Sequence, residues 1–330
     1  MSRLAFLFDC DYRTRDLVLS WDDGLRAALS KIGEDWDVAA FAPGGQADFN
    51  LGNVRVHQRP KRADALLAAQ DWLPDLALCW GSLDRPLHGR IREVAPKTAI
   101  CFAGGPTQHP FLVNFDLIFA ETSYHVENFQ ARGVNVRQAF GVNTDLFKPN
   151  PWQQPRFLAI QPASFAAYKR YGLFAKAFGK DGLAVGQVQL RSDGAVFEGE
   201  VCHEVCLRYG VAVIPRMVPY YMMPYMYGLA QTCVITTTTY GGGDRAVLEA
   251  MACGKPVIFC NDNAKLGKLV PLFHNPPSVE PDAVAIRQAA EETASTWDED
   301  DAKFVRNWVL EGYSVEVYAR QLREGLESLL

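Results

Sequence analysis

Three consecutive glycines, Gly241, Gly242 and Gly243, stand before a segment with helical spacing, "DRAVLEAMA". Glycine adopts positive φ and lets the backbone approach a ligand closely, and a helix beginning near Asp244 would direct its free N–H groups to the same place. Glu249 would lie on the second turn of that helix, where its carboxylate could accept hydrogen bonds from two hydroxyl groups. These residue types predict a site for an anion and for sugar hydroxyls. A strand-to-helix loop with an exposed Glu249 would produce the same local pattern.

A second set of candidate residues, mostly basic, follows the apolar runs in the first half of the chain. These are Arg13, Arg15, Arg59, Lys61, Arg62, Arg85, His88 and Arg90. If the apolar runs are parallel strands, the loops that follow them meet at one edge of the sheet. Basic side chains gathered there would bind a phosphate-bearing molecule. Asp11, Asp16 and Asp84 offset part of this charge, so scattered solvated charges are the alternative.

Two short patterns have the spacing of metal ligands. Cys202, His203 and Cys206 would form half of a zinc site, but no second Cys or His pair at ligand spacing accompanies them. Asp9 and Asp11 form a D-x-D pattern that directly follows the first apolar run. We therefore expect no metal site in this protein.

Composition narrows the class of protein. The chain has 330 residues with 48% hydrophobic content, enough for two cores of ordinary domain size. A net charge of −5 excludes a generally basic nucleic-acid coat, although a local basic surface stays possible. No apolar run approaches the length that spans a membrane, the N-terminal run is too short for a signal peptide, and the eight cysteines are scattered. We expect a cytoplasmic protein with reduced thiols.

The elements that must position these residues alternate between strand-like and helix-like patterns. The first half contains the strand patterns "RLAFLF", "DVAAFA", "NVRVHQ", "LALCW", "TAICFA" and "DLIFAE". The second half contains "FLAIQP", "QVQLRS", "VAVIP", "CVITTT" and "KPVIFC". Helical patterns lie between them, which is typical of an α/β fold with parallel sheets.

A proline-rich segment, "KPNPWQQPR", interrupts the alternation near residue 150. It predicts two Rossmann-like β/α/β domains, 1–150 and 151–330, that face each other across a cleft. The last helix, about 308–330, is a candidate to cross back to the first domain. Open parallel sheets bind ligands at the carboxyl ends of their strands, so the loops after the strands are the expected sites.

The segment "GGGDRAVLEAMACGKPVI" resembles the C-terminal motif of GT-B glycosyltransferases, especially the large retaining family with the E-x7-E motif, glycosyltransferase family 4. The likeness is strongest in the second half of the segment. Further stretches are similar to that family in the same order: "GVNTDLFKPN", "KRYGLFAKAF", "VPYYMMPYMYGLA" and "GYSVEVYARQL". Together they cover the chain from about residue 119 to its end.

The resemblance implies roles for individual residues. Glu249 matches the second Glu of the motif, which bonds the ribose hydroxyls, with Gly242 and Gly243 in the loop before it. Lys169 matches the lysine that neutralises the donor diphosphate, although an ordinary exposed helix lysine is the alternative. The residues around the nucleotide base would be Arg216, Met217 and Val218.

The chain departs from the family pattern at two places. Gly241 stands where the first Glu of the motif handles sugar hydroxyls, so Asp244 or glycine amides would have to serve. Ser164 stands where the family has an arginine, and Arg245 is the candidate to replace that cation.

In the first domain, the family often has a histidine just after the fifth strand. Here that place reads "CFAGGPTQHP". Gly104 and Gly105 would permit close backbone approach to the donor. His109 follows a few residues late and is a candidate catalytic residue, with a structural loop histidine as the alternative.

The resemblance implies transfer of a sugar from a nucleotide-diphosphate sugar, with a UDP-sugar as the expected co-substrate, to an acceptor hydroxyl. Retention of anomeric configuration is implied, with no prosthetic group and no metal, because Lys169, Arg245 and the helix N-terminus would stabilise the leaving diphosphate. A nucleotide-sugar epimerase and a non-catalytic sugar-nucleotide binding module are the alternatives.

The sequence leaves the acceptor open. The basic loops would suit DNA or another phosphate-bearing polymer, and the compact two-domain build resembles bacteriophage DNA glycosyltransferases, whose acceptors are hydroxymethylated pyrimidines. A saccharide or a lipid-linked acceptor of the bacterial envelope is equally admissible. The oligomeric state is not specified by the sequence.

Overall fold

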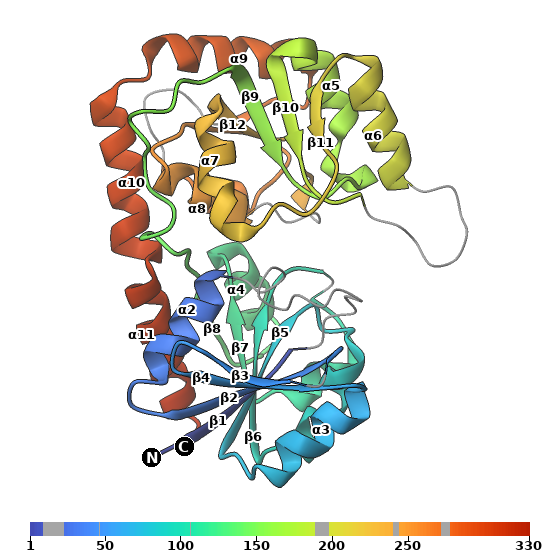
Figure 1. Ribbon diagram of the computed structural model, residues 1–330, viewed down its shortest axis with the longest axis vertical. Helices are drawn as coiled ribbons and strands as arrows, with labels where there is room; N and C mark the ends of the chain where they lie inside the picture. Colours follow the sequence, from blue (N-terminus) through green and yellow to red (C-terminus); the bar gives the residue numbers. More distant parts are fainter. Residues whose placement is uncertain (9–22, 46, 106, 189–197, 240–243, 272–277) are drawn as a thin grey trace. The chain divides into compact units, whose positions relative to one another are not determined.

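The structure is a computed structural model of the 330-residue chain (Figure 1). It describes residues 1–8, 23–45, 47–105, 107–188, 198–239, 244–271 and 278–330. The described part forms two compact units. The first comprises Met1–Val142 with Tyr313–Leu330, and the second comprises Asn143–Gly312.

The first unit is built on an eight-stranded sheet with the order β3-β4-β2-β1-β5-β6-β7-β8. Its strands are β1 (Arg3–Leu7), β2 (Asp37–Pro43), β3 (Asp48–Leu51), β4 (Val54–Arg59), β5 (Leu76–Gly81), β6 (Lys97–Phe102), β7 (Leu117–Ala120) and β8 (Val136–Gln138). All neighbouring strands pair in parallel except β3, which pairs antiparallel with β4. The carboxyl ends of the parallel strands therefore share one edge.

Helices cover both faces of this sheet because its strands are apolar on both sides. In β1, Leu4 and Phe6 belong to one buried cluster while Ala5 and Leu7 belong to another, as expected when successive side chains point to opposite faces. The helical elements are α2 (Asp23–Ile32), α3 (Arg62–Asp71), η1 (Pro86–Glu93), η2 (Pro110–Asn114), α4 (Ser123–Gln130) and α11 (Val315–Glu327).

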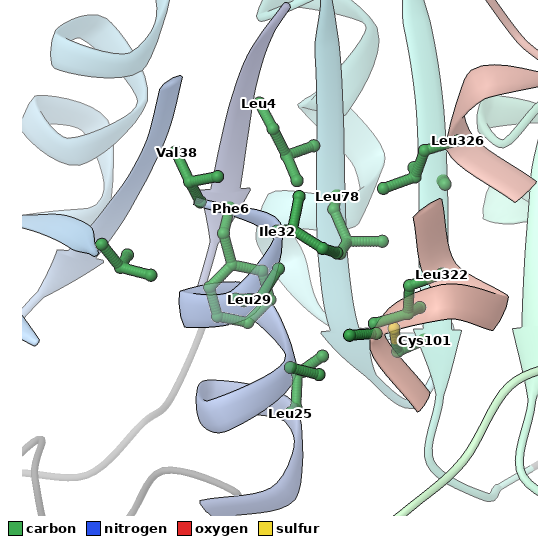
Figure 2. Packing of buried hydrophobic residues seen from close by; sticks show 14 of the residues in the cluster. Leu4, Phe6, Leu25, Leu29, Ile32, Val38, Leu78, Cys101, Leu322 and Leu326 are labelled. Atoms are coloured by element: carbon green, nitrogen blue, oxygen red, sulfur yellow. The ribbon is translucent and has the colours of Figure 1, made fainter. Parts of the chain in front are cut away.

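The C-terminal helix α11 belongs to the first unit. Figure 2 shows Leu322 and Leu326 of α11 in the same buried cluster as Leu29 and Ile32 of α2 and Phe6 of β1. The helix begins with Ser314, whose hydroxyl accepts a hydrogen bond from the Val317 N–H. The last helix of the chain thus completes the core of the first unit.

The second unit contains a six-stranded parallel sheet with the order β11-β10-β9-β12-β13-β14. Its strands are β9 (Phe157–Pro162), β10 (Gly182–Val185), β11 (Ala212–Ile214), β12 (Ala230–Ile235), β13 (Val257–Cys260) and β14 (Ser278–Val279). The sequence placed a strand at "QVQLRS" instead of at β10. That prediction was wrong for Gln187 and Val188, of which Val188 forms only an isolated bridge to Phe165.

Helices also cover both faces of the second sheet. One face packs against α5 (Tyr171–Phe178), α6 (Glu198–Arg208) and α9 (Ala283–Thr296). The other elements are η3 (Ala167–Lys169), η4 (Gly179–Asp181), η5 (Tyr220–Met222), α7 (Met223–Gly228), α8 (Asp244–Ala252), η7 (Leu266–Lys268) and α10 (Glu299–Tyr313). Among the described residues, no helix is long and apolar enough to cross a membrane.

Candidate functional site

Three loops meet at the carboxyl edge of the second sheet. They follow β9, β12 and β13, which are neighbours in the sheet, and they span residues 163–170, 236–239 and 261–265. The Thr238 N–H donates to the Tyr168 carbonyl oxygen at 3.3 Å, and the Thr239 hydroxyl donates to the Asp262 carbonyl oxygen at 2.7 Å. Hydrogen bonds between the loops therefore hold them together as one surface.

Lys169 ends η3 and is 7% exposed, so it is not an ordinary exposed helix lysine. Its carbonyl oxygen accepts hydrogen bonds from the Gln161 side-chain amide at 3.0 Å and from the Thr236 hydroxyl at 2.6 Å. Its ammonium lies 5.2 Å from the ring centroid of Tyr168, within cation–π distance. The side chains of Gln161 on β9 and Thr236 just after β12 therefore fix the backbone of Lys169.

Arg170 has a left-handed backbone with φ of 51°, a conformation that costs a non-glycine residue about 1–2 kcal/mol. Its guanidinium binds the Asp262 carboxylate through two bonds, Nη1 to Oδ2 at 2.6 Å and Nη2 to Oδ1 at 2.8 Å, and its Nε donates to the Thr236 carbonyl. The hydrogen bonds from Arg170 lower the pKa of the Asp262 carboxyl. Burial lowers the pKa of Arg170, but the hydrogen bonds and charge of Asp262 together with Cys260 give a net rise. No motif in the sequence indicated this ion pair.

Glu249 lies on α8 and is 4% exposed, which excludes the exposed position that the sequence left open. Its Oε1 accepts a hydrogen bond from the Tyr220 hydroxyl, and its Oε2 accepts one from the Tyr227 hydroxyl at 2.7 Å. Burial raises the pKa of Tyr227 well above its ordinary value, and the charge of Glu249 raises it further. The Tyr227 phenol therefore stays protonated and donates to the carboxylate.

Phe147, in the segment before β9, packs against both tyrosines. The ring of Phe147, which is fully buried, lies edge-on at 5.3 Å from the Tyr220 ring and 6.1 Å from the Tyr227 ring. Arg306 of α10 donates to the carbonyl oxygen of Phe147 at 2.8 Å and to that of Ala252, at the end of α8, at 2.5 Å. Glu249 is thus positioned by contacts that begin outside its own helix.

The start of α8 already carries an internal anion. Asp244 is 2% exposed and its Oδ2 lies 3.3 Å from the ammonium of Lys265, which is 1% exposed. A carboxylate at a helix N-terminus is favourable, and the lysine offsets its charge. Within the described part of the chain, Asp244 Oδ1 and the buried Asn263 Oδ1 have no hydrogen-bond partner. Lys265 and Asn263 carried no motif by which the sequence could have indicated them.

The remaining predicted donor residues fall at the same edge or outside the described chain. Arg216, Met217 and Val218 follow β11, and Tyr220, four residues after Arg216, joins this loop to Glu249. Arg245 lies half-buried on the first turn of α8. The predicted residues Gly241, Gly242 and Gly243 lie outside the described residues.

In the first unit, the loop after β6 has the conformation that its glycines predicted. Gly104 and Gly105 have φ of 89° and 95°, and a Cβ added at Gly104 would meet nothing within 4 Å. His109 is the N-cap residue of η2, and its Nδ1 accepts a hydrogen bond from the Phe111 N–H at 3.2 Å. This bond gives His109 a local structural role.

The proposed basic rim is smaller than the sequence indicated. His88 lies on the buried side of η1, fully buried and with its ring edge-on to Phe115; its predicted place on an exposed rim is therefore wrong. Arg59 binds Asp48 at 2.7 Å. Arg90 likewise binds Glu93 at 2.7 Å.

Three other basic residues of the predicted rim are accessible at the surface. Lys61 is exposed before α3, and Arg85 is half-exposed before η1. Arg62, the first residue of α3, is also half-exposed. The predicted residues Arg13 and Arg15 lie outside the described part of the chain.

The predicted half of a zinc site lies on α6. Cys202 and Cys206 are free thiols on α6, and burial together with Cys202 raises the pKa of Cys206 to about 12. The described residues contain no group of three or more His, Cys, Asp or Glu side chains placed to hold a metal ion. Asp9 and Asp11 lie outside them.

No model of a known protein family matches this chain, and no curated protein sequence matches it. Solved structures do resemble it. Sucrose-phosphate synthase from Thermosynechococcus elongatus superposes with a TM-score of 0.74 at 17% identity, covering 100% of this chain and 99% of that one. HepE of Anabaena, in complex with UDP and glucose, reaches 0.73 at 15% identity and covers 100% of both chains. A UDP-forming α,α-trehalose-phosphate synthase from Burkholderia xenovorans reaches 0.65 at 12% identity, over 100% of this chain and 99% of that one. This similarity over the whole chain confirms the GT-B fold.

Proposed function

We propose that this protein is a glycosyltransferase that moves a sugar from a nucleotide-diphosphate sugar, with UDP as the expected nucleotide, to an acceptor hydroxyl. The observation that carries the proposal is that buried Lys169 follows β9 and that α8, which carries the tyrosine-held Glu249, follows the neighbouring strand β12, so both elements start from the carboxyl edge of one parallel sheet. Ligands of open α/β sheets bind at this edge. Likeness to HepE, which was solved with UDP and glucose, supports the choice of donor.

In this proposal the second unit binds the donor. The base lies against Arg216, Met217 and Val218, and the ribose hydroxyls donate to Glu249. Each carboxylate oxygen accepts up to two hydrogen bonds, so Glu249 can bind ribose while both tyrosines remain in place. Tyr220 and Tyr227 orient the carboxylate.

The chemical step breaks the bond between the anomeric carbon and the diphosphate oxygen and forms a bond to the acceptor oxygen, whose proton passes to the departing diphosphate. Lys169, Arg245 and the N–H groups at the start of α8 stabilise the charge that grows on the diphosphate. Asp244 contributes an acceptor for sugar hydroxyls through its unpartnered oxygen. We expect retention of anomeric configuration and no metal.

The first unit is proposed to bind the acceptor, and Gly104, Gly105 and His109 in the loop after β6 stay candidate site residues. The basic surface formed by its described residues is limited, since Arg59 and Arg90 are paired with acids and His88 is buried. This pairing favours a small phosphate-bearing or saccharide acceptor over a long polyanion. The sucrose-phosphate and trehalose-phosphate synthases, named for phosphorylated sugars, share the fold.

The test offers UDP-glucose and other nucleotide sugars with three acceptor classes: sugar phosphates, neutral or lipid-linked glycans, and DNA with hydroxymethylated pyrimidines. UDP release that depends on an acceptor supports transfer, and the anomeric configuration of the product, by NMR, tests retention. A new sugar nucleotide without acceptor would indicate an epimerase instead. Binding without turnover would indicate a sugar-nucleotide binding module. Transfer to modified DNA that weakens with salt would favour the polyanion.

A further inference from the structure

Arg170 has a backbone conformation that arginine rarely adopts. Its φ of 51° lies in the left-handed region, which glycine tolerates, and among the described non-glycine residues only Leu73 and Arg170 have positive φ. The Arg170 side chain binds the Thr236 carbonyl and the Asp262 carboxylate from this backbone position.

The guanidinium of Arg170 lies at the edge that carries the proposed donor site. Its Nε is held by the Thr236 carbonyl at the end of β12, and its two terminal nitrogens are held by Asp262 after β13. The Arg170 side chain is 20% exposed and that of Asp262 is 43% exposed, so solvent and ligands can reach the pair. Thr239, which bonds the Asp262 carbonyl, precedes the loop that leads into α8. The Arg170 side chain therefore extends from the loop after β9, past the end of β12, to the loop after β13.

We propose that Arg170 is a further cation of the diphosphate subsite, in addition to Lys169 and Arg245, and that Asp262 holds it when the donor is absent. This inference rests on the proposed function. The guanidinium has five N–H groups, and its three bonds to Thr236 and Asp262 use three of them. On donor binding, the terminal nitrogens exchange the carboxylate for phosphate oxygens, which match the same planar fork. The bond to Thr236 keeps the guanidinium in place during the exchange.

The proposal makes the two members of the ion pair act in opposite directions. Arg170 attracts the diphosphate, whereas Asp262 competes with the diphosphate for the same donors. Removing the arginine should weaken binding, and neutralising the aspartate should strengthen it. A pair that only supports the fold would give losses of the same sign, because either change breaks the same contact.

The experiment measures the affinity of the full chain for UDP and for uridine by calorimetry, together with the melting temperature. Arg170→Gly removes the guanidinium while suiting the left-handed backbone, and we expect UDP affinity to fall at least tenfold with uridine affinity and melting temperature nearly unchanged. Asp262→Asn should raise UDP affinity at least twofold. Arg170→Lys should give an intermediate affinity. Arg208→Ala, which removes an exposed arginine paired with Glu204 on α6, is the control with the same change in charge.

Unchanged UDP affinity in Arg170→Gly would overturn the inference. Parallel losses of affinity in Arg170→Gly and Asp262→Asn, accompanied by lower melting temperatures, would also overturn it in favour of a structural pair. A wild-type chain that binds neither UDP nor uridine would instead refute the proposed function itself. The three results are distinct, so the two proposals fail separately.

Discussion

At the scale of single residues, the proposed donor site depends on how a few buried side chains are held. The hydroxyl groups of Tyr220 and Tyr227 donate to the two carboxylate oxygens of Glu249. A buried carboxylate held by donors on both oxygens keeps one orientation. The ribose hydroxyls would therefore meet an acceptor that needs no rearrangement.

We expect Glu249→Gln to weaken UDP binding by about tenfold, since an amide offers one acceptor where the carboxylate offers two and its NH2 faces a tyrosine hydroxyl. Calorimetry with UDP measures the change, and circular dichroism checks that the fold is intact. Glu204→Gln, on the exposed side of α6, is the control. Equal affinity for UDP in the wild type and in Glu249→Gln would remove this residue from the site.

Lys169→Ala should lower kcat more than it raises KM, with a loss in kcat of about 10²–10³-fold, because the charge on the diphosphate grows in the transition state. Lys176→Ala, an exposed lysine on the neighbouring helix α5, should leave both parameters unchanged. Steady-state kinetics with varied donor separates the two parameters. A rise in KM alone would show that Lys169 binds only the ground state.

At the scale of elements, the beginning of α8 depends on the buried pair of Asp244 and Lys265. Breaking such a pair leaves one buried charge without a partner, which is far more costly than the pair is stabilising. Because the pair joins α8 to the loop after β13, it also fixes where the N–H groups at the start of the helix point.

Lys265→Met should lower the free energy of unfolding by about 3–5 kcal/mol, since Asp244 would remain buried and charged. Adding Asp244→Asn to that variant should recover part of the loss. Lys303→Met, which breaks an exposed pair with Glu299 on α10, should leave the free energy of unfolding nearly unchanged. Urea unfolding measures all three variants. Equal costs for the buried and exposed pairs would contradict this account.

The elements that the sequence predicted well are those with strong periodicity. The strands around Phe6, Leu78 and Ile258 lie where apolar runs placed them, because parallel strands covered on both faces read as continuous apolar segments. The strand near Val188 was misplaced, since "GLAV" directly follows a helix and has no alternation to mark it. Short runs of this kind depend on tertiary pairing more than on local pattern.

The candidate site was only partly predictable for a related reason. Glu249 and Lys169 could be found because they belong to a motif with fixed spacing. The contacts around them could not be found, since Tyr220 and Tyr227 reach Glu249 from η5 and α7, and Asp262 reaches Arg170 from the loop after β13. Burial likewise removed His88 from the rim, although Arg85 and Arg90 close to it in sequence are accessible.

At the scale of the whole molecule, each unit has its own buried clusters, so we expect two unfolding transitions in calorimetry. Leu322→Ala opens the cluster between α11 and α2 and should destabilise the first unit by about 2–5 kcal/mol. UDP at a hundred times its Kd should stabilise the other transition by about 2.7 kcal/mol. Leu310→Ala, at a partly exposed position of α10, is the control. A single transition moved by both changes would show that the units unfold together.

The path of the chain through the two units has a consequence for engineering. The second unit is one continuous segment, Asn143–Gly312, inserted into the first, and the residues on either side of the insertion are joined by a hydrogen bond from the Val142 N–H to the Tyr313 carbonyl at 2.9 Å. A gene in which codon 142 is fused through a short linker to codon 313 would therefore encode the first unit without disturbing its strand order or its closing helix. Conversely, a foreign domain with adjacent termini could be grafted between the same two codons. The protein is in effect a natural example of domain insertion, and its parts could be exchanged as modules.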